Sequence, residues 1–270
     1  MSPELSAERC RQALLDHTRR LAECALAAGG DAAVPTCPEW TVAGLVQHVG
    51  QTQRWVSELI ERRVTDPSEL PTEMAEPPAE PQAWPAWLSD AAARAAAACS
   101  DAALEASVFN AAGDNRTGAQ FWLHSLLNEA VVHGFDAAVA AGHDYDLDAD
   151  IAAGLITNHL AMLTSPTWAA QRPDSAAAMR GTNETLHWHA TDEPGLGAAG
   201  EWFIERRPDG VSWQHGHGKA DVTVHGPAKS LLLVLTRRLP LTGAHADGVT
   251  IDGNAELAQH WLGHTAHVAG

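Results

Sequence analysis

Basic residues are scarce in this sequence, and long apolar runs are missing. Lysine and arginine together number 17, against 34 aspartate and glutamate residues, so the formal net charge of the 270 residues is −17. Nucleic acids and anionic membrane surfaces are bound through clustered lysine and arginine, and an acidic chain repels both. No apolar run approaches the ~20 residues of a membrane-spanning helix. We therefore expect neither a nucleic-acid partner nor a membrane partner.

Cysteine is also rare, and no CxxC pair is present. The four cysteines lie at positions 10, 24, 37 and 99, in sequence typical of helices or loops, which favours reduced thiols over disulfides or a metal cluster. The first ten residues, MSPELSAERC, lack the basic and apolar regions of a signal peptide. With 45% apolar and 19% charged residues, the composition is typical of a folded globular protein. These features together favour a cytoplasmic location.

The first half of the chain has the periodicity of helices. Apolar residues recur at helical spacing in four segments, and Thr41 is a plausible N-cap for the second while Gly142 follows the fourth. A stretch rich in proline and glutamate, residues 65–82, separates the second and third segments and is expected to be an exposed loop, either a lid or a simple connection. The sequence thus predicts a four-helix bundle over residues 1–150, with helices at 5–28, 42 onward, 84–105 and 119–141.

The second half changes character. After one more helix at 151–163, four segments alternate like half-buried strands with glycines between them. Two helical patterns follow, at 227–239 and 254–264. We expect a smaller α+β domain over residues 151–270, with strands in TLHWHA, EWFIERR, VSWQHG and ADVTVHG.

One helical segment places a carboxylate and an imidazole together in apolar surroundings. Glu129 and His133 stand four residues apart in NEAVVHGFDA, so both side chains point the same way. A buried glutamate is costly unless it is paired or bound to a metal. His48, on the second helix, is the candidate for a third ligand. The alternative is a Glu–His ion pair that faces solvent.

Other histidines and carboxylates have competing explanations. Glu256, His260 and His264 lie on one stripe of the last helix, away from its apolar residues, which favours adventitious chelation at the surface. Asp221 and His225 would lie ~13 Å apart along a strand, too far for one metal.

Histidine pairs at strand spacing occur at His187/His189 and at His215/His217. No nearby carboxylate or third histidine is evident for either pair, so exposed strand faces are the expected explanation. The run DYDLDAD resembles the start of a calcium loop, but Ala149 and Leu155 occupy positions that need glycine and glutamate. A solvated linker with acids at a helix N-terminus is preferred for Asp144, Asp146, Asp148 and Asp150.

Two segments, CPEWTVAGLVQHVG at 37–50 and NEAVVHGFDAA at 128–138, resemble the mycothiol-dependent maleylpyruvate isomerase family. The resemblance implies a DinB-like bundle with His48, Glu129 and His133 as metal ligands. It implies that Asp136 supports a ligand or packs the helix. The later segments DVTVHGPAKSLLLVLTRRLPL and VTIDGNAELAQHWL resemble the family's C-terminal domain, which is similar to sterol-carrier folds.

The sequence departs from this family at three places. Gly44 and Asn128 stand where members often have an acidic residue and a histidine, and Gly263-His264 stands where many have an arginine. An arginine fork would suit a dianionic substrate such as maleylpyruvate. Arg54 lies well round its helix from His48, and Arg116 is expected to be a solvated loop charge. The missing arginine weakens the isomerase assignment and leaves the metal ligands untouched.

Two histidines and one carboxylate leave a coordination position open, as in catalytic zinc sites, and also suit non-haem Fe(II). A coordinating thiol is deprotonated by the cation, and the resemblance implies mycothiol, an actinobacterial thiol, as that group. We expect a metal-dependent mycothiol S-transferase, with zinc as the metal, that attacks a small electrophile in a cleft between the domains. It would act in detoxification or natural-product biosynthesis, such as thiol exchange on an antibiotic precursor. The alternatives are a cis-trans isomerase of the maleylpyruvate type, a hydrolase that uses metal-activated water, and a non-catalytic ligand-binding protein.

Overall fold

The computed structural model describes residues 5–243 and 248–265. Residues 1–4 of the N-terminal segment MSPELSAERC lie outside these ranges. The described chain divides into two compact units, one from Ser6 to Asp146 and one that comprises Leu5 and the residues from Leu147 onward. Within the described ranges, no helix is both long enough and apolar enough to cross a membrane.

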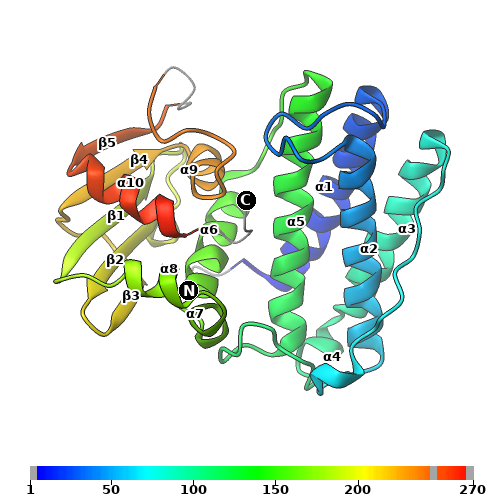
Figure 1. Cartoon of the computed structure of the whole chain (residues 1–270), viewed down its shortest axis with the longest axis horizontal. Helices are drawn as coiled ribbons and strands as arrows, with labels where there is room; N and C mark the ends of the chain where they lie inside the picture. Colours follow the sequence, from blue (N-terminus) through cyan, green and yellow to red (C-terminus); the bar gives the residue numbers. More distant parts are fainter. Residues whose placement is uncertain (1–4, 244–247, 266–270) are drawn as a thin grey trace. The chain divides into compact units, whose positions relative to one another are not determined.

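The first unit is helical, as the sequence predicts. Four long helices form a bundle in which α1 packs against α5 and α3, and α2 packs against α3 and α5 (Figure 1). A short helix, α4, precedes α5, and two 3₁₀ turns interrupt the proline-rich loop after α2. The bounds are α1 Ala7–Ala28, α2 Val42–Glu61, η1 Pro67–Glu69, η2 Pro81–Ala83, α3 Trp84–Ala98, α4 Asp101–Leu104 and α5 Gly118–Ala141.

The helix ends follow local chemistry. The side chain of Thr41 accepts a hydrogen bond from the backbone N–H of Gly44 and begins α2, as expected for an N-cap. Gly142 has φ 68° and ψ 29° and ends α5 in the left-handed conformation that glycine adopts without strain. The predicted single helix at 84–105 is wrong: it ends at Ala98, and Ser100 begins α4 as its N-cap. A serine followed by aspartate is itself an N-cap signal.

Apolar burial holds the bundle together near its second helix. Leu21, Val42, Leu45, Val46 and Leu88 belong to one buried cluster, and the partly buried Trp87 packs against it. Trp87 lies so close to α2 that a Cβ atom on Gly50 would fall 1.9 Å from its ring. Glycine at this position, two residues after His48, therefore allows α3 to approach α2 closely.

The second unit contains a mixed five-stranded sheet with helices, the α+β architecture that the sequence predicts. The strand order is β3-β2-β1-β4-β5, in which only β1 and β4 pair in parallel. Its elements are α6 Ala149–Leu163, α7 Pro166–Gln171, α8 Pro173–Ala178, β1 Glu184–Ala190, η3 Gly197–Gly200, β2 Glu201–Arg207, β3 Gly210–His215, β4 Val222–Gly226, α9 Ala228–Leu235, β5 Thr250–Gly253 and α10 Ala255–His264.

The two faces of this sheet differ. Leu186 and Trp188 of β1 alternate with His187 and His189, so the apolar and imidazole side chains point to opposite faces. The apolar face is buried, and the indole of Trp202, on the same face, donates to Thr157 Oγ1 of α6. The sequence did not predict α7, α8 or β5. The two helices have six residues each, and β5 is a largely exposed edge strand of four residues, too short for a clear periodic pattern.

Candidate metal centre

Two helices of the bundle bring His48, Glu129 and His133 together. His48 projects from α2, and the other two project from successive turns of α5. Glu129 Oε2 lies 2.8 Å from His48 Nε2 and 3.2 Å from His133 Nε2. The candidate ligand atoms of the three residues all lie within 4.8 Å of one another. The predicted third partner of the Glu129–His133 pair is therefore in place.

Asp136 orients the inner histidine. Its Oδ2 atom lies 2.9 Å from His133 Nδ1, and its Oδ1 atom accepts a 2.5 Å hydrogen bond from Thr36 Oγ1. The Asp136 side chain is fully buried, and the thiol of Cys37 lies 3.9 Å from Oδ2. A carboxylate behind a histidine in this way fixes which ring nitrogen is free to bind a metal. Here that nitrogen is Nε2, which faces Glu129.

Trp40 forms a wall beside both imidazoles. Its ring is stacked on His133 at 5.5 Å between centroids and meets His48 edge-on at 5.0 Å. A tight loop positions it just before α2 begins, because the Val34 N–H donates to the Trp40 carbonyl and the Trp40 N–H donates to the Cys37 carbonyl. Trp40 and Thr36 were not predicted from the sequence as site residues. The two prolines of residues 34–41, VPTCPEWT, are the sequence feature that could have indicated a structured loop here.

The three groups stabilise one another's charges. Burial would raise the pKa of Glu129, but hydrogen bonds from His133 and His48 outweigh it and hold that pKa well below its usual range. Burial would lower the pKa of His133, but its bonds to Asp136 and Glu129 outweigh this effect and raise the pKa to about 9. Without a metal, the site is therefore a carboxylate–imidazolium pair, consistent with the ion-pair alternative. The pair lies in a cluster and not on an open surface, since the His133 side chain is only 11% exposed.

The donor set fits a divalent metal ion. Two imidazole nitrogens and a carboxylate oxygen are the ligands of many catalytic zinc sites. With ligand bonds of ~2.0–2.2 Å, tetrahedral donors stand ~3.3 Å apart, so the observed contacts of 2.8 and 3.2 Å need only small side-chain rotations. The side chains of His48 and Glu129 are 37% and 31% exposed. These residues could hold an ion and leave one position open to an incoming group.

The two arginines considered as substitutes for the missing tail arginine have other partners. Arg54 Nη2 lies 2.9 Å from Asp90 Oδ2, and its guanidinium covers the ring of Trp87. Arg116 Nη2 lies 2.6 Å from Asp114 Oδ2. The expectation that Arg116 is a solvated loop charge is wrong, because its side chain is only 23% exposed and belongs to this ion pair.

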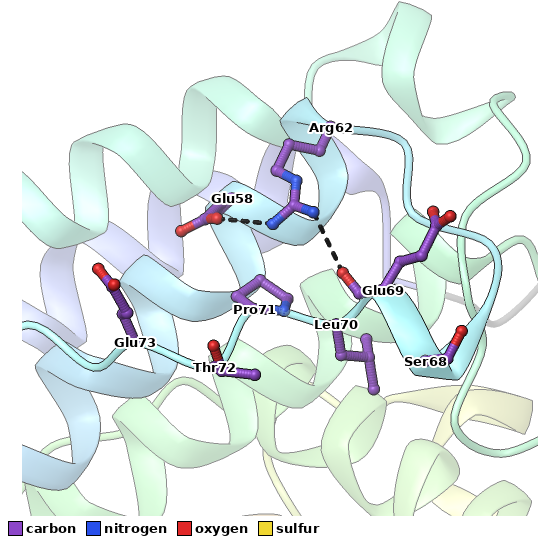
Figure 2. Close-up of a pocket in the computed structure, with 8 residues that line it drawn as sticks. All are labelled: Glu58, Arg62, Ser68, Glu69, Leu70, Pro71, Thr72 and Glu73. Carbon is purple, nitrogen blue, oxygen red and sulfur yellow. Dashed lines mark hydrogen bonds and ion pairs between the residues drawn. The ribbon is translucent and has the colours of Figure 1, made fainter.

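A cavity of about 390 Å³ lies elsewhere in the bundle, between the end of α2 and the loop that follows. Figure 2 shows that Arg62 spans it, donating to the Glu58 carboxylate and to the Glu69 carbonyl. Two hydrogen bonds connect the same loop to α2 near His48. The indole of Trp55 donates to the Pro71 carbonyl, and the side-chain amide of Gln51 donates to the Ala75 carbonyl. The cavity's single basic side chain, Arg62, is paired with Glu58, and none of the three metal-site residues lines the cavity. We therefore do not assign the reaction to it.

The other sequence patterns that combine carboxylates and histidines, or several carboxylates, form no metal-binding group among the described residues. His260 and Glu256 are exposed, and His260 Nε2 donates to Ala178 O, in line with a surface stripe. Asp221 accepts hydrogen bonds from Thr185, whereas His225 pairs with Asp252. In DYDLDAD, Asp144 and Asp146 lie between α5 and α6, Asp148 is the N-cap residue of α6, and Asp150 lies in the first turn of α6.

The expectation of exposed strand faces at the paired histidines is wrong. His187 is only 2% exposed, and both it and His189 contact the carboxylate of Glu201, which His217 also approaches. His215 points elsewhere and contacts Thr157 Oγ1 of α6. A carboxylate and a third histidine are thus present, although sequence spacing did not reveal them.

Comparison with known families agrees with this architecture. The sequence profile of the mycothiol maleylpyruvate isomerase N-terminal domain matches residues 8–138. The helical unit, residues 6–146, belongs to this domain family. The chain's second unit is similar to the SCP-2 sterol transfer family, whose profile matches residues 167–263. The family resemblance stated from the sequence is confirmed in both parts. No curated protein matches the chain.

Similarity to solved structures is weak. The sec-alkylsulfatase Pisa1 from Pseudomonas sp. is 16% identical over 85% of this chain and 46% of that one, with a TM-score of 0.31. A double mutant of PisA1 gives the same identity and TM-score over 55% of this chain and 25% of the other. The chain thus spans less than half the length of these proteins.

Proposed function

We propose that this protein is a metal-dependent mycothiol S-transferase whose metal ligands are His48, Glu129 and His133. The observation that supports this most directly is the convergence of the three ligand atoms within 4.8 Å in a domain of the mycothiol maleylpyruvate isomerase family. The co-substrates would be mycothiol and a small electrophile. Zinc fits the donor set best, because a two-histidine, one-carboxylate site with an open position is typical of catalytic zinc.

When bound, the ion would favour the thiolate form of an entering thiol, which is the nucleophilic form. The chain's own residues have separate tasks in this scheme. Asp136 holds His133 in one tautomer, and Trp40 keeps both imidazole rings from rotating. The partly exposed edges of His48 and Glu129 leave room for the thiol. In the transfer, the thiol loses its proton, sulfur bonds to an electrophilic carbon, and the leaving group departs with its electron pair.

Isomerisation is the second candidate, because the domain family takes its name from a maleylpyruvate isomerase. The same thiol would add to a conjugated double bond and be expelled after rotation about the resulting single bond. The thiol is then recovered unchanged. In a transfer reaction it is consumed and appears in the product.

The test is an assay of the purified protein with mycothiol and a panel of electrophiles, before and after metal removal by a chelator. We expect thiol-dependent turnover that the chelator abolishes and Zn²⁺ restores, with a thiol adduct detected by mass spectrometry. His133→Ala should abolish turnover, whereas His124→Ala, a half-buried histidine of the same helix outside the cluster, should retain it. Turnover without any thiol would indicate a hydrolase. Ligand binding unaffected by the chelator, without turnover, would indicate a binding protein.

A further inference from the structure

A second group of metal-binding side chains lies in the α+β unit, on the face of the sheet opposite its apolar core. His187 and His189 point to the same side of β1, and Glu201 begins β2 directly across from His189 in the antiparallel register. His217 follows the end of β3, the neighbour of β2 (Figure 1). Three successive strands of the sheet thus supply four potential ligands to one place.

The contacts within this group centre on the Glu201 carboxylate. His187 Nε2 lies 2.5 Å from Oε2, His189 Nδ1 lies 2.8 Å from Oε1, and His217 Nδ1 lies 3.6 Å from Oε2. The four ligand atoms all lie within 4.8 Å of one another. Tetrahedral zinc donors stand ~3.3 Å apart, so the observed separations bracket the spacing that an ion needs.

The local structure builds this cluster into the fold. His187 is almost fully buried, and the Glu201 side chain is 15% exposed. Glycines flank His217: Gly216 has φ 147°, and a Cβ atom on Gly218 would lie 2.8 Å from the ring of Phe203. Glycine at both positions lets the chain turn back over β2 and bring His217 to the carboxylate.

Because one carboxylate faces three imidazoles, not every polar atom of the cluster has a well-formed hydrogen bond. His189 Nδ1 is buried and, although it is close to Glu201, it has no hydrogen bond of good geometry. Imidazole nitrogens that converge on one carboxylate are suited to bind a metal cation.

We propose that His187, His189, Glu201 and His217 bind a second divalent transition-metal ion, distinct from that of the helical domain. Three nitrogens and one oxygen are a borderline donor set that suits Zn²⁺ and neighbouring first-row ions rather than Mg²⁺ or Ca²⁺. A bound ion would connect the segment after β3, which carries His217, to strands β1 and β2. Because the His217 side chain is 77% exposed, this ligand gives the ion its route from solvent.

The test is a Zn²⁺ titration of the full chain after chelator treatment, followed by calorimetry. The starting protein combines Glu129→Gln with His133→Ala, which removes the first centre. We expect it to bind one equivalent of Zn²⁺ and to gain thermal stability on binding. Adding His189→Gln and His217→Gln should weaken this binding by more than about a hundredfold, since loss of a residue that merely supports a ligand already costs about 10–100-fold. Both positions are partly or largely exposed, so the fold should be retained, which circular dichroism checks.

His225→Gln is the matched control. It lies on the same face of the sheet, across from His189 on β4, but pairs with Asp252 outside the cluster. This variant should keep the full equivalent of zinc. X-ray absorption of the zinc-loaded starting protein should show only nitrogen and oxygen donors, with about three imidazoles.

Two outcomes would overturn the proposal. The first is that the starting protein binds no stoichiometric zinc. The second is that the His189→Gln, His217→Gln combination leaves its binding unchanged. The two centres can be tested separately. If the first centre binds no metal, wild type and the Glu129→Gln, His133→Ala protein will bind the same number of zinc equivalents, whatever the second centre does.

Discussion

Asp136 Oδ2 lies 2.9 Å from His133 Nδ1, and this contact turns the other ring nitrogen of His133 toward Glu129 and His48. The two residues are three apart on α5, so one helix supplies a ligand together with its support. The Asp136 carboxylate has no solvent exposure and is held in turn by Thr36. The orientation of the candidate ligand is therefore set by groups that incoming thiol does not reach.

The first prediction follows from this contact. Asp136→Asn should lower the affinity of the first centre for Zn²⁺ by about 10–100-fold, because a neutral amide makes the imidazole a weaker and less well oriented donor. Competition with a chromogenic chelator measures the change. Asp16→Asn, an exchange on the exposed surface of α1, is the control and should have no effect. An unchanged affinity in Asp136→Asn would show that the contact only packs the helix.

A second prediction concerns pH in the metal-free protein. The pKa of His133 is raised in the folded state to about 9, so its contribution to stability is complete below the unfolded pKa of ~6.5 and is lost as pH rises to about 9. The lowered pKa of Glu129 has the opposite sign, and its contribution is lost as pH falls below ~4.5. Stability without metal should therefore be greatest near pH 5–6.

Urea unfolding in the presence of a chelator measures this dependence. Between pH 6 and pH 9 the wild type should lose on the order of 1–3 kcal/mol more than His133→Gln, which has no charge to lose. Equal slopes in the two proteins would contradict the charged pair. With zinc bound, stability should instead fall from neutral toward acid pH, since protons compete with the ion for the ligands.

The sequence predicted the candidate metal centre of the helical unit better than the histidine cluster of the sheet, for a physical reason. The partners Glu129 and His133 are one helical turn apart, so spacing alone places them on one face. Trp40 and Thr36 were missed because they reach the site from a loop, whose path depends on tertiary contacts. His189 and Glu201 are partners only through the β1–β2 register. That register depends on the long connection between the strands and leaves no periodic signal.

A third prediction tests helix packing beside His48. Gly50→Ala should destabilise the bundle by about 1–3 kcal/mol, because its Cβ would overlap the Trp87 ring and force α3 away from α2. Gly44→Ala on the same helix is the control, since its Cβ would meet only Thr41 Oγ1 at 3.6 Å. That change should be neutral or stabilising by up to ~1 kcal/mol, as helix propensity favours alanine. Thermal and urea unfolding compare the two, and similar losses in both would refute the packing argument.

The histidines of the last helix supply a fourth prediction. His260 is exposed and donates to the Ala178 carbonyl, while His264 is hydrogen-bonded to the His260 carbonyl. Changing both to Gln should leave turnover and the zinc content of the two proposed centres unchanged, because these residues belong to neither cluster. Metal analysis and the thiol assay check this result. A loss of turnover would mean that α10 contributes to the site.

The last prediction concerns the charge of the substrate. A dianion such as maleylpyruvate needs a cationic partner, and a lost bidentate contact typically costs ~2–5 kcal/mol, or roughly 30-fold or more in binding. Gly263-His264 occupies the place of the family's tail arginine, and Arg54 and Arg116 are already paired with Asp90 and Asp114. We expect weak turnover of maleylpyruvate and better turnover of neutral or zwitterionic electrophiles. Steady-state kinetics with maleylpyruvate and its neutral dimethyl ester make the comparison. A kcat/KM for maleylpyruvate near ~10⁵ M⁻¹s⁻¹ or above would contradict the prediction and favour isomerisation over transfer.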